Sequence, residues 1–114
     1  MSKGYLRTPF SLNYTRIPML LTELQKRHLR KLAHNLKPLV IVGGSGLSDG
    51  VINEIDQTLA HHELIKVRIN AMDREERDAM IAAICETLEC ALVQRIGHIA
   101  IIYRPAEKPV IRLP

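Results

Sequence analysis

The stretch from Leu39 to Ile55, with the sequence LVIVGGSGLSDGVINEI, changes character twice within seventeen residues. It begins with four consecutive branched apolar residues, a pattern typical of a strand that is covered on both faces. Three glycines and a serine follow, and apolar residues then recur at helical spacing. A strand that leads directly into a helix predicts an α/β fold, because strand–helix–strand units build sheets that contain parallel strands.

Helices and strands alternate along the rest of the chain. Thr22 with Gln25 forms a capping box that opens a first helix, and Pro38 stops that helix. Gly97-His98 is a two-residue hairpin turn between two apolar segments. The predicted helices cover 22–36, 48–61 and a segment that opens at Asp73, and the predicted strands cover 39–42, 63–69 and both sides of the hairpin turn. We therefore predict the order αβαβαββ, in a two-layer or three-layer sandwich with a mixed, mostly parallel four-stranded sheet.

The chain of 114 residues is long enough for one domain and too short for two. Residues 1–18 hold three basic residues, no acidic residue and no periodic pattern. We interpret them as a disordered N-terminal extension, or as residues upstream of a translation start at Met19. Residues 19–114 are then expected to form the single folded domain.

Acidic and basic residues are segregated along the chain, whose net charge is +4. Residues 39–90 hold ten acidic and four basic residues, whereas 19–38 hold five basic residues and one acidic residue. On the first predicted helix one arc is apolar, made of Leu21, Leu29, Leu32 and Leu36. The opposite arc is basic, made of Lys26, Arg27, Arg30, Lys31, His34 and Lys37. This segregation predicts one face that meets a polyanion, with a merely solvated face as the alternative.

The glycine-rich loop that follows Val42 has three interpretations. A nucleotide-phosphate loop needs a lysine followed by Ser or Thr, but Gly46 is followed by Leu47. A dinucleotide-binding turn needs G-x-G-x-x-G, which the glycines here do not match. The four residues 43–46 do match GxxG, with which KH domains grip a nucleic-acid backbone. A backbone clamp and a plain tight turn therefore both stay open.

Several short motifs follow one another in a fixed order. They are Leu32-Ala33-His34 and Leu36-Lys37-Pro38 in the basic helix, the loop Gly43–Leu47, HHELIKV from His61 to Val67, and Tyr103-Arg104-Pro105. Together they resemble the CRM domain, the chloroplast RNA splicing and ribosome maturation domain, whose bacterial single-domain form is the YhbY family. The resemblance covers residues 21–105, or most of the chain.

The resemblance implies an RNA-binding module with a fold similar to the C-terminal domain of translation initiation factor three. Bacterial members are associated with precursors of the large ribosomal subunit, so ribosomal RNA is the implied partner. The residues expected to contact RNA are Lys26, Arg27, Arg30, Lys31, His34, Lys37, Gly43, Gly44, Ser45, Gly46 and Arg104. Many members have lysine where this chain has Gly44, so more of the affinity is expected from the basic helix. The alternative is a ribosome-associated protein-interaction module without direct RNA contact.

Residue patterns for catalysis or metal binding are weak. Ser45 has no evident base, and Cys85 and Cys90 lack the electropositive surroundings that a reactive thiolate needs. His61-His62 is joined by no further Cys or His that would complete a metal site. We therefore expect no enzymatic activity, metal, cofactor or small-molecule substrate. No apolar run approaches the roughly 20 residues of a membrane span, and free thiols fit a cytoplasmic protein, which we expect to be a monomer.

Overall fold

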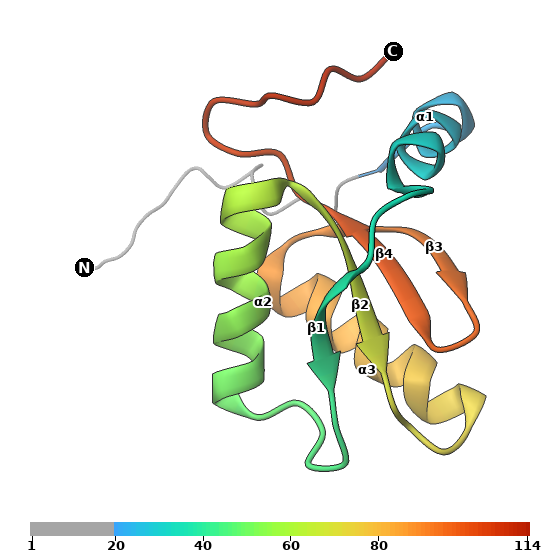
Figure 1. The fold of residues 1–114 in the computed structure, drawn as a ribbon, viewed down its shortest axis with the longest axis vertical. Coiled ribbons are helices and arrows are strands. Elements are labelled where there is room, and N and C mark those ends of the chain that lie inside the picture. The colour runs from blue at the N-terminus through green and yellow to red at the C-terminus, as the bar shows by residue number, and fades with distance from the viewer. Residues whose placement is uncertain (1–19) are drawn as a thin grey trace.

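The computed structural model describes residues 20–114, so the expectation for residues 1–18 lies outside the described part of the chain. The elements are α1 (Glu23–Ala33), β1 (Pro38–Val42), α2 (Asp49–His62), β2 (Leu64–Ile69), α3 (Arg74–Leu88), β3 (Ala91–Ile96) and β4 (Ile99–Tyr103). The predicted order αβαβαββ and the mixed four-stranded sheet are confirmed (Figure 1).

The strands are arranged in the order β1-β2-β4-β3. Strand β1 pairs with β2 in parallel, whereas β4 pairs antiparallel with both β2 and β3. The expected mostly parallel sheet is therefore wrong. A simple crossover through α3 would place β3 next to β2 and pair the two in parallel. Instead β4, after its hairpin turn, lies between β2 and β3 and pairs antiparallel with each of them.

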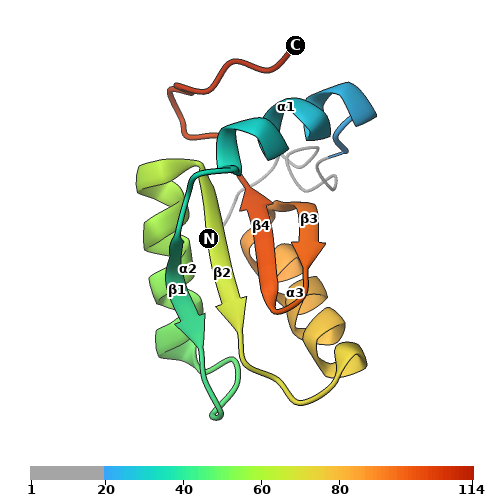
Figure 2. The same ribbon diagram turned by 45° about the vertical axis from the view of Figure 1, so that its right-hand side comes forward.

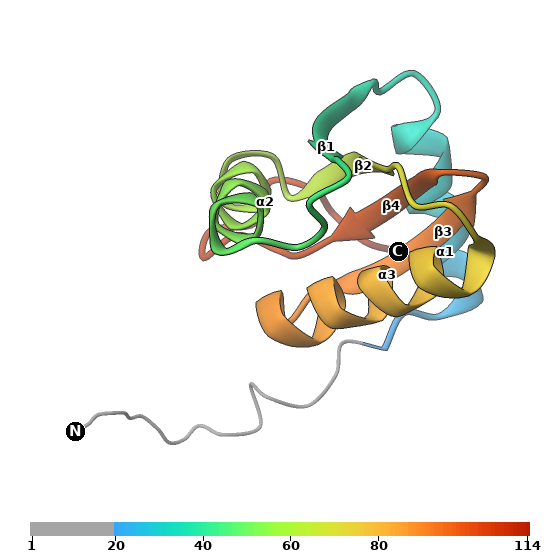
Figure 3. The same cartoon turned by 90° about the horizontal axis from the view of Figure 1, so that it is seen from below.

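Helices cover the two faces of the sheet unequally. Helices α2 and α3 pack on one face, and α1 packs on the other near the end at which β4 finishes (Figure 2, Figure 3). The larger core cluster joins the sheet to α2 and α3 and includes Val42, Ile55, Leu59, Val67 and Ile84. The smaller cluster joins the sheet to α1 and consists of Leu29, Ala33, Leu64, Val93, Ile101 and Tyr103. The arrangement is thus three-layered, with an incomplete third layer.

Helix α1 is shorter than predicted, and its buried side differs from the expected apolar arc. The backbone N–H of His34 donates to the carbonyl of Lys31 at 3.3 Å, and that of Leu36 donates to Ala33 at 3.0 Å. These tighter turns end the helix before Leu36. Leu32 and Leu36, which were expected to face the core, are 45% and 39% exposed.

Strand β1 is covered on one face only, although its continuous apolar run predicted cover on both. Val40 and Val42 are buried, whereas Leu39 and Ile41 are 51% and 59% exposed. Because α1 lies over the far end of the second face, neither Leu39 nor Ile41 belongs to a core cluster of residues 20–114.

Glu63, which was expected to begin the second strand, instead terminates α2. Its backbone adopts φ +64°, and its carboxylate accepts hydrogen bonds from the N–H groups of Ala106 (2.7 Å), Val110 (3.1 Å) and Ile111 (2.9 Å). Burial raises the pKa of Glu63, but the three backbone donors outweigh this and lower it below the ordinary value of 4.5.

This carboxylate fixes the C-terminal segment, residues 104–114, which runs toward α1 and ends beside it (Figure 1, Figure 2). Ile111 and Leu113 of the segment pack against the smaller core cluster. The Gln25 side-chain amide also donates to the carbonyl of Pro114 at 3.3 Å. The position of α1 therefore depends partly on the C-terminal segment.

Candidate nucleic-acid interface

The basic side of α1 faces outward because its other side is anchored in the core. Thr22 and Gln25 fix the start of the helix, since the side chain of each accepts the backbone N–H of the other at 3.0 Å. Leu29 and Ala33 are wholly buried, and residues three or four apart share one face of a helix. Their burial leaves the other faces of α1, which carry the basic residues, at the surface.

The predicted basic residues gather on this helix surface. A shallow hollow of about 400 Å³ is lined by Arg27, Arg30, Lys31, His34 and Asn35. Within residues 20–114 the three cations of the hollow form no ion pair with an acidic side chain, whereas Lys26 Nζ lies 3.7 Å from Glu23 Oε2. Lys37 is exposed in the turn between α1 and β1. Neighbouring cations without an acidic partner favour an anion such as phosphate.

The glycine loop joins β1 to the N-terminus of α2. The N–H of Gly46 donates to the carbonyl of Gly43 at 3.0 Å, and the N–H of Ser48 donates to Gly46 at 3.1 Å. Ser48 then caps α2 by accepting the Val51 N–H at 3.2 Å. Gly46 adopts φ +75°, a conformation that favours glycine. At this position the plain-turn interpretation is sufficient.

Gly43 and Gly44 are different. Neither has a positive φ, and a Cβ atom on either would meet nothing within 4 Å. Neither the fold nor crowding therefore requires glycine at these two positions. Absent side chains would allow a ligand to approach the exposed backbone closely, which is what a clamp needs. Asp49, in the first turn of α2, opposes anion binding there and makes the loop a weaker phosphate site than α1.

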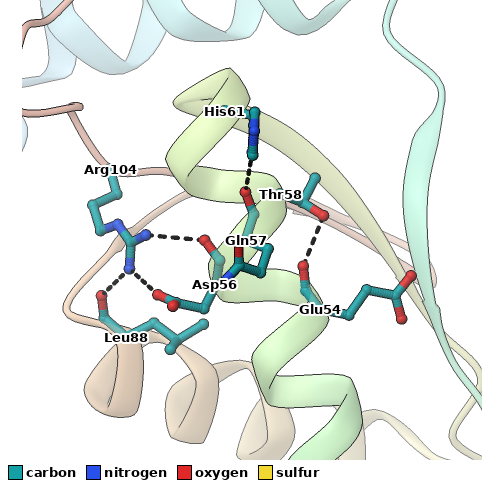
Figure 4. A network of polar contacts seen from close by, with 7 residues as sticks. All are labelled: Glu54, Asp56, Gln57, Thr58, His61, Leu88 and Arg104. Carbon is teal, nitrogen blue, oxygen red and sulfur yellow. Dashed lines mark hydrogen bonds and ion pairs between the residues drawn. The ribbon is translucent and has the colours of Figure 1, made fainter.

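Arg104 is held by hydrogen bonds within the fold (Figure 4). Its guanidinium donates to Asp56 Oδ1 at 2.8 Å and to the carbonyls of Asp56 and Leu88 at 3.1 Å each. The side chain is 23% exposed and ties α2 to the end of α3. This geometry gives Arg104 a structural role, and an RNA contact by Arg104 stays a prediction.

Helix α1 and the glycine loop lie at opposite ends of β1 (Figure 1). Strand β1 has five residues, so the two features are separated by roughly 15 Å at the usual rise per residue. Two basic residues that the sequence analysis missed, Lys66 and Arg68, occupy β2 next to β1. They alternate with buried Ile65, Val67 and Ile69, and this period of two could have revealed them as one basic face of a strand.

Other classes of site find little support in the described part of the chain. Within residues 20–114 no group of three or more His, Cys, Asp or Glu side chains is arranged to hold a metal ion. None of the three helices in that range is both long enough and apolar enough to cross a bilayer. Exposed acidic residues are concentrated on α2 and α3, on the other side of the sheet from α1.

Comparison with known proteins agrees with this fold. Residues 21–104 match the profile of the CRS1 / YhbY (CRM) domain. An RNA-binding protein of Haemophilus influenzae is 49% identical over 94 residues, which are 82% of this chain and 95% of that protein. The chloroplastic group IIA intron splicing facilitator CRS1 of Zea mays is 33% identical over 90 residues, which are 74% of this chain and 12% of that protein. The solution structure of a hypothetical protein from Staphylococcus aureus superposes with a TM-score of 0.73 at 38% identity, over 83% of this chain and 100% of that one. The chain belongs to the CRS1 / YhbY (CRM) domain family.

Proposed function

We propose that the protein is a non-enzymatic RNA-binding protein that acts on ribosomal RNA in precursors of the large ribosomal subunit, in the cytoplasm. The observation that carries the proposal is the hollow on α1, where Arg27, Arg30 and Lys31 lie together without an acidic partner within residues 20–114. Relatives named as RNA-binding proteins and as an intron splicing facilitator support RNA as the ligand class. These names do not specify the RNA, so the assignment to precursors of the large ribosomal subunit is the more specific part of the proposal.

The structure favours recognition of the RNA backbone over reading of base sequence. Arginine and lysine side chains on α1 supply charge to phosphates, which fixes the position of an RNA without specifying its sequence. Gly43 and Gly44 leave the loop backbone open for a second phosphate contact. The four aromatic residues of the whole chain are too few for aromatic stacking to dominate.

One observation favours the alternative, a ribosome-associated module that contacts only protein. Leu24 and Leu32 on α1 are 56% and 45% exposed beside the cations. Exposed apolar side chains next to charges are also found at protein–protein interfaces. An acidic protein partner would then replace RNA on the same helix.

Binding to purified RNA separates the two functions. Fluorescence anisotropy with a protein-free fragment of large-subunit ribosomal RNA should give saturable binding that weakens steeply with salt. Absence of such binding, together with retention on ribosomal particles, would favour the protein-contact alternative. In cells, crosslinking followed by sequencing of the attached RNA should enrich large-subunit precursor RNA over mature ribosomal RNA. Equal recovery of all abundant RNAs would contradict the assembly role.

A further inference from the structure

Helix α1 covers one face of the sheet only in part, and among residues 20–114 the rest of that face remains open. Leu64 and Tyr103 pair across β2 and β4 and are buried beneath α1. Side chains alternate along a strand, so Lys66 and Arg68 share this face farther along β2. The open area therefore begins where α1 ends and continues toward the glycine loop.

One row of side chains crosses all four strands in the open area. The register pairs Ile41 with Arg68, Arg68 with Ile99, and Ile99 with Ile96. Ile41 and Ile96 are 59% and 56% exposed. Arg68 thus lies between isoleucines in this row, and the row reaches β1 at Ile41, two residues before the glycine loop begins at Gly43.

The charge of this face is of one sign. The four strands contain no acidic residue. Arg68 Nε donates to Asn70 Oδ1 at 3.1 Å, which orients its guanidinium without neutralising it. Lys66 pairs with Pro38 on one side and with Ile101 on the other, and so lies between α1 and the Arg68 row. Cations therefore continue from α1 across the sheet toward the loop.

Exposed isoleucines beside cations fit an unpaired RNA segment better than a duplex. In a duplex the bases are stacked on one another, and mostly phosphates and sugars are offered to a protein surface. In a single strand the faces of the bases are free, and they bury apolar area against aliphatic side chains while the phosphates meet lysine and arginine.

We propose that an unpaired stretch of RNA crosses the open sheet face, from the basic side of α1 over Lys66 and Arg68 to the glycine loop, with its bases against Ile41, Ile99 and Ile96. This rests on the proposed RNA-binding function and adds the structural class of the ligand. It also explains how α1 and the loop, at opposite ends of β1, engage one molecule.

The test compares single-stranded and duplex RNA of equal length in anisotropy titrations. Lys66→Gln with Arg68→Gln should weaken binding of the single strand at least tenfold at low salt and reduce the salt slope by about one to two units. Arg74→Gln with Lys108→Gln is the matched control, because it removes the same two charges from α3 and the C-terminal segment. That control should lower affinity no more than about twofold.

The apolar part is tested separately. Ile41→Thr with Ile96→Thr preserves branched strand residues and should weaken single-strand binding about threefold or more while leaving duplex binding unchanged. Val110→Thr, at an exposed position of the C-terminal segment, is the control. Melting curves verify that the variants fold. NMR gives a test without any substitution: the backbone amide chemical shifts of Arg68 and Ile99 in the parent protein should change when RNA is added.

The outcomes distinguish the two levels of the proposal. If the parent protein binds no RNA, the proposed function fails. A second outcome concerns only the path across the sheet. The parent would bind RNA and lose affinity on Arg30→Ala with Lys31→Ala, but the Lys66/Arg68 and Ile41/Ile96 variants would bind both RNAs as the parent does. If the amide signals of Arg68 and Ile99 also do not shift, the proposed path of RNA across the sheet is overturned. The open face would then be left for a protein.

Discussion

Replacing Glu63 by glutamine tests how the fold positions α1. The substitution preserves side-chain size and the φ +64° backbone but removes the charge. The two donors on Oε1, the N–H groups of Val110 and Ile111, can still meet a carbonyl oxygen. Oε2, which accepts the Ala106 N–H at 2.7 Å, becomes an amide donor that faces another donor.

The cost follows from these three contacts. A hydrogen bond to a charged group contributes about 1.5–3 kcal/mol and a neutral one about 1 kcal/mol. One contact is lost and two are weakened, so we expect the free energy of unfolding to fall by about 3 kcal/mol. If the C-terminal segment detaches first, the loss appears as faster hydrogen exchange of the amides of Ala106, Val110 and Ile111.

Urea denaturation followed by circular dichroism, with hydrogen exchange by NMR, measures both forms of the loss. Glu107→Gln removes one charge from an exposed position of the same segment and should change stability by less than about 0.5 kcal/mol. An unfolding free energy and amide protection like those of the parent would refute the anchoring role of Glu63.

The pH dependence gives an independent check. The folded-state pKa of Glu63 lies below its ordinary value of 4.5. Its stabilising contribution is therefore fully present above about pH 4.5 and is lost as the pH falls through the folded-state pKa. The stability difference between the parent and Glu63→Gln should be constant near neutral pH and shrink in acid. Tyr103, whose pKa is raised by burial and by the Glu63 charge, should titrate at lower pH in the variant.

Four further predictions concern the glycine loop, Arg104 and the N-terminus. Gly44→Lys should leave the melting temperature nearly unchanged and tighten RNA binding at low salt. Gly44→Asp should weaken binding, measured by anisotropy, by about 1–3 kcal/mol. If both variants bind RNA as the parent does, the loop is only a turn. Gly46→Ala should instead lower stability by about 1 kcal/mol, because of its positive φ. Arg104→Gln should lower the unfolding free energy by about 2 kcal/mol, because contacts to Asp56 are lost. The salt dependence of RNA binding should keep the same slope. A flatter slope at equal stability would favour a direct contact between Arg104 and RNA. A protein that starts at Met19 should melt as the full chain does, and a large fall in melting temperature would contradict the extension interpretation of residues 1–18.

The sequence was sufficient for the order of elements because those signals are local. The Thr22 capping box is present with both of its hydrogen bonds, and Ser48 and Asp73 cap α2 and α3. The Gly97-His98 turn also lies where it was predicted. Each of these depends on contacts within a few residues, which periodicity and capping rules describe directly.

Features that depend on distant segments were missed. Four apolar residues in β1 predicted cover on both faces, yet the extent of cover was decided by where α1 docks. The burial of Glu63 depends on donors more than forty residues later in the chain. Lys66 and Arg68 were visible as an alternating pair, but only the sheet order places them between α1 and the loop.

The most direct test of RNA binding through α1 is the salt dependence of affinity for the Arg30→Ala with Lys31→Ala variant. If about six phosphates are contacted, the parent should lose roughly three orders of magnitude in affinity between about 50 and 200 mM salt. The variant should bind more weakly at low salt, with a slope about one to two units flatter, at unchanged melting temperature. A parent-like slope and affinity would contradict the account, because the basic side of α1 would then lie outside the RNA interface.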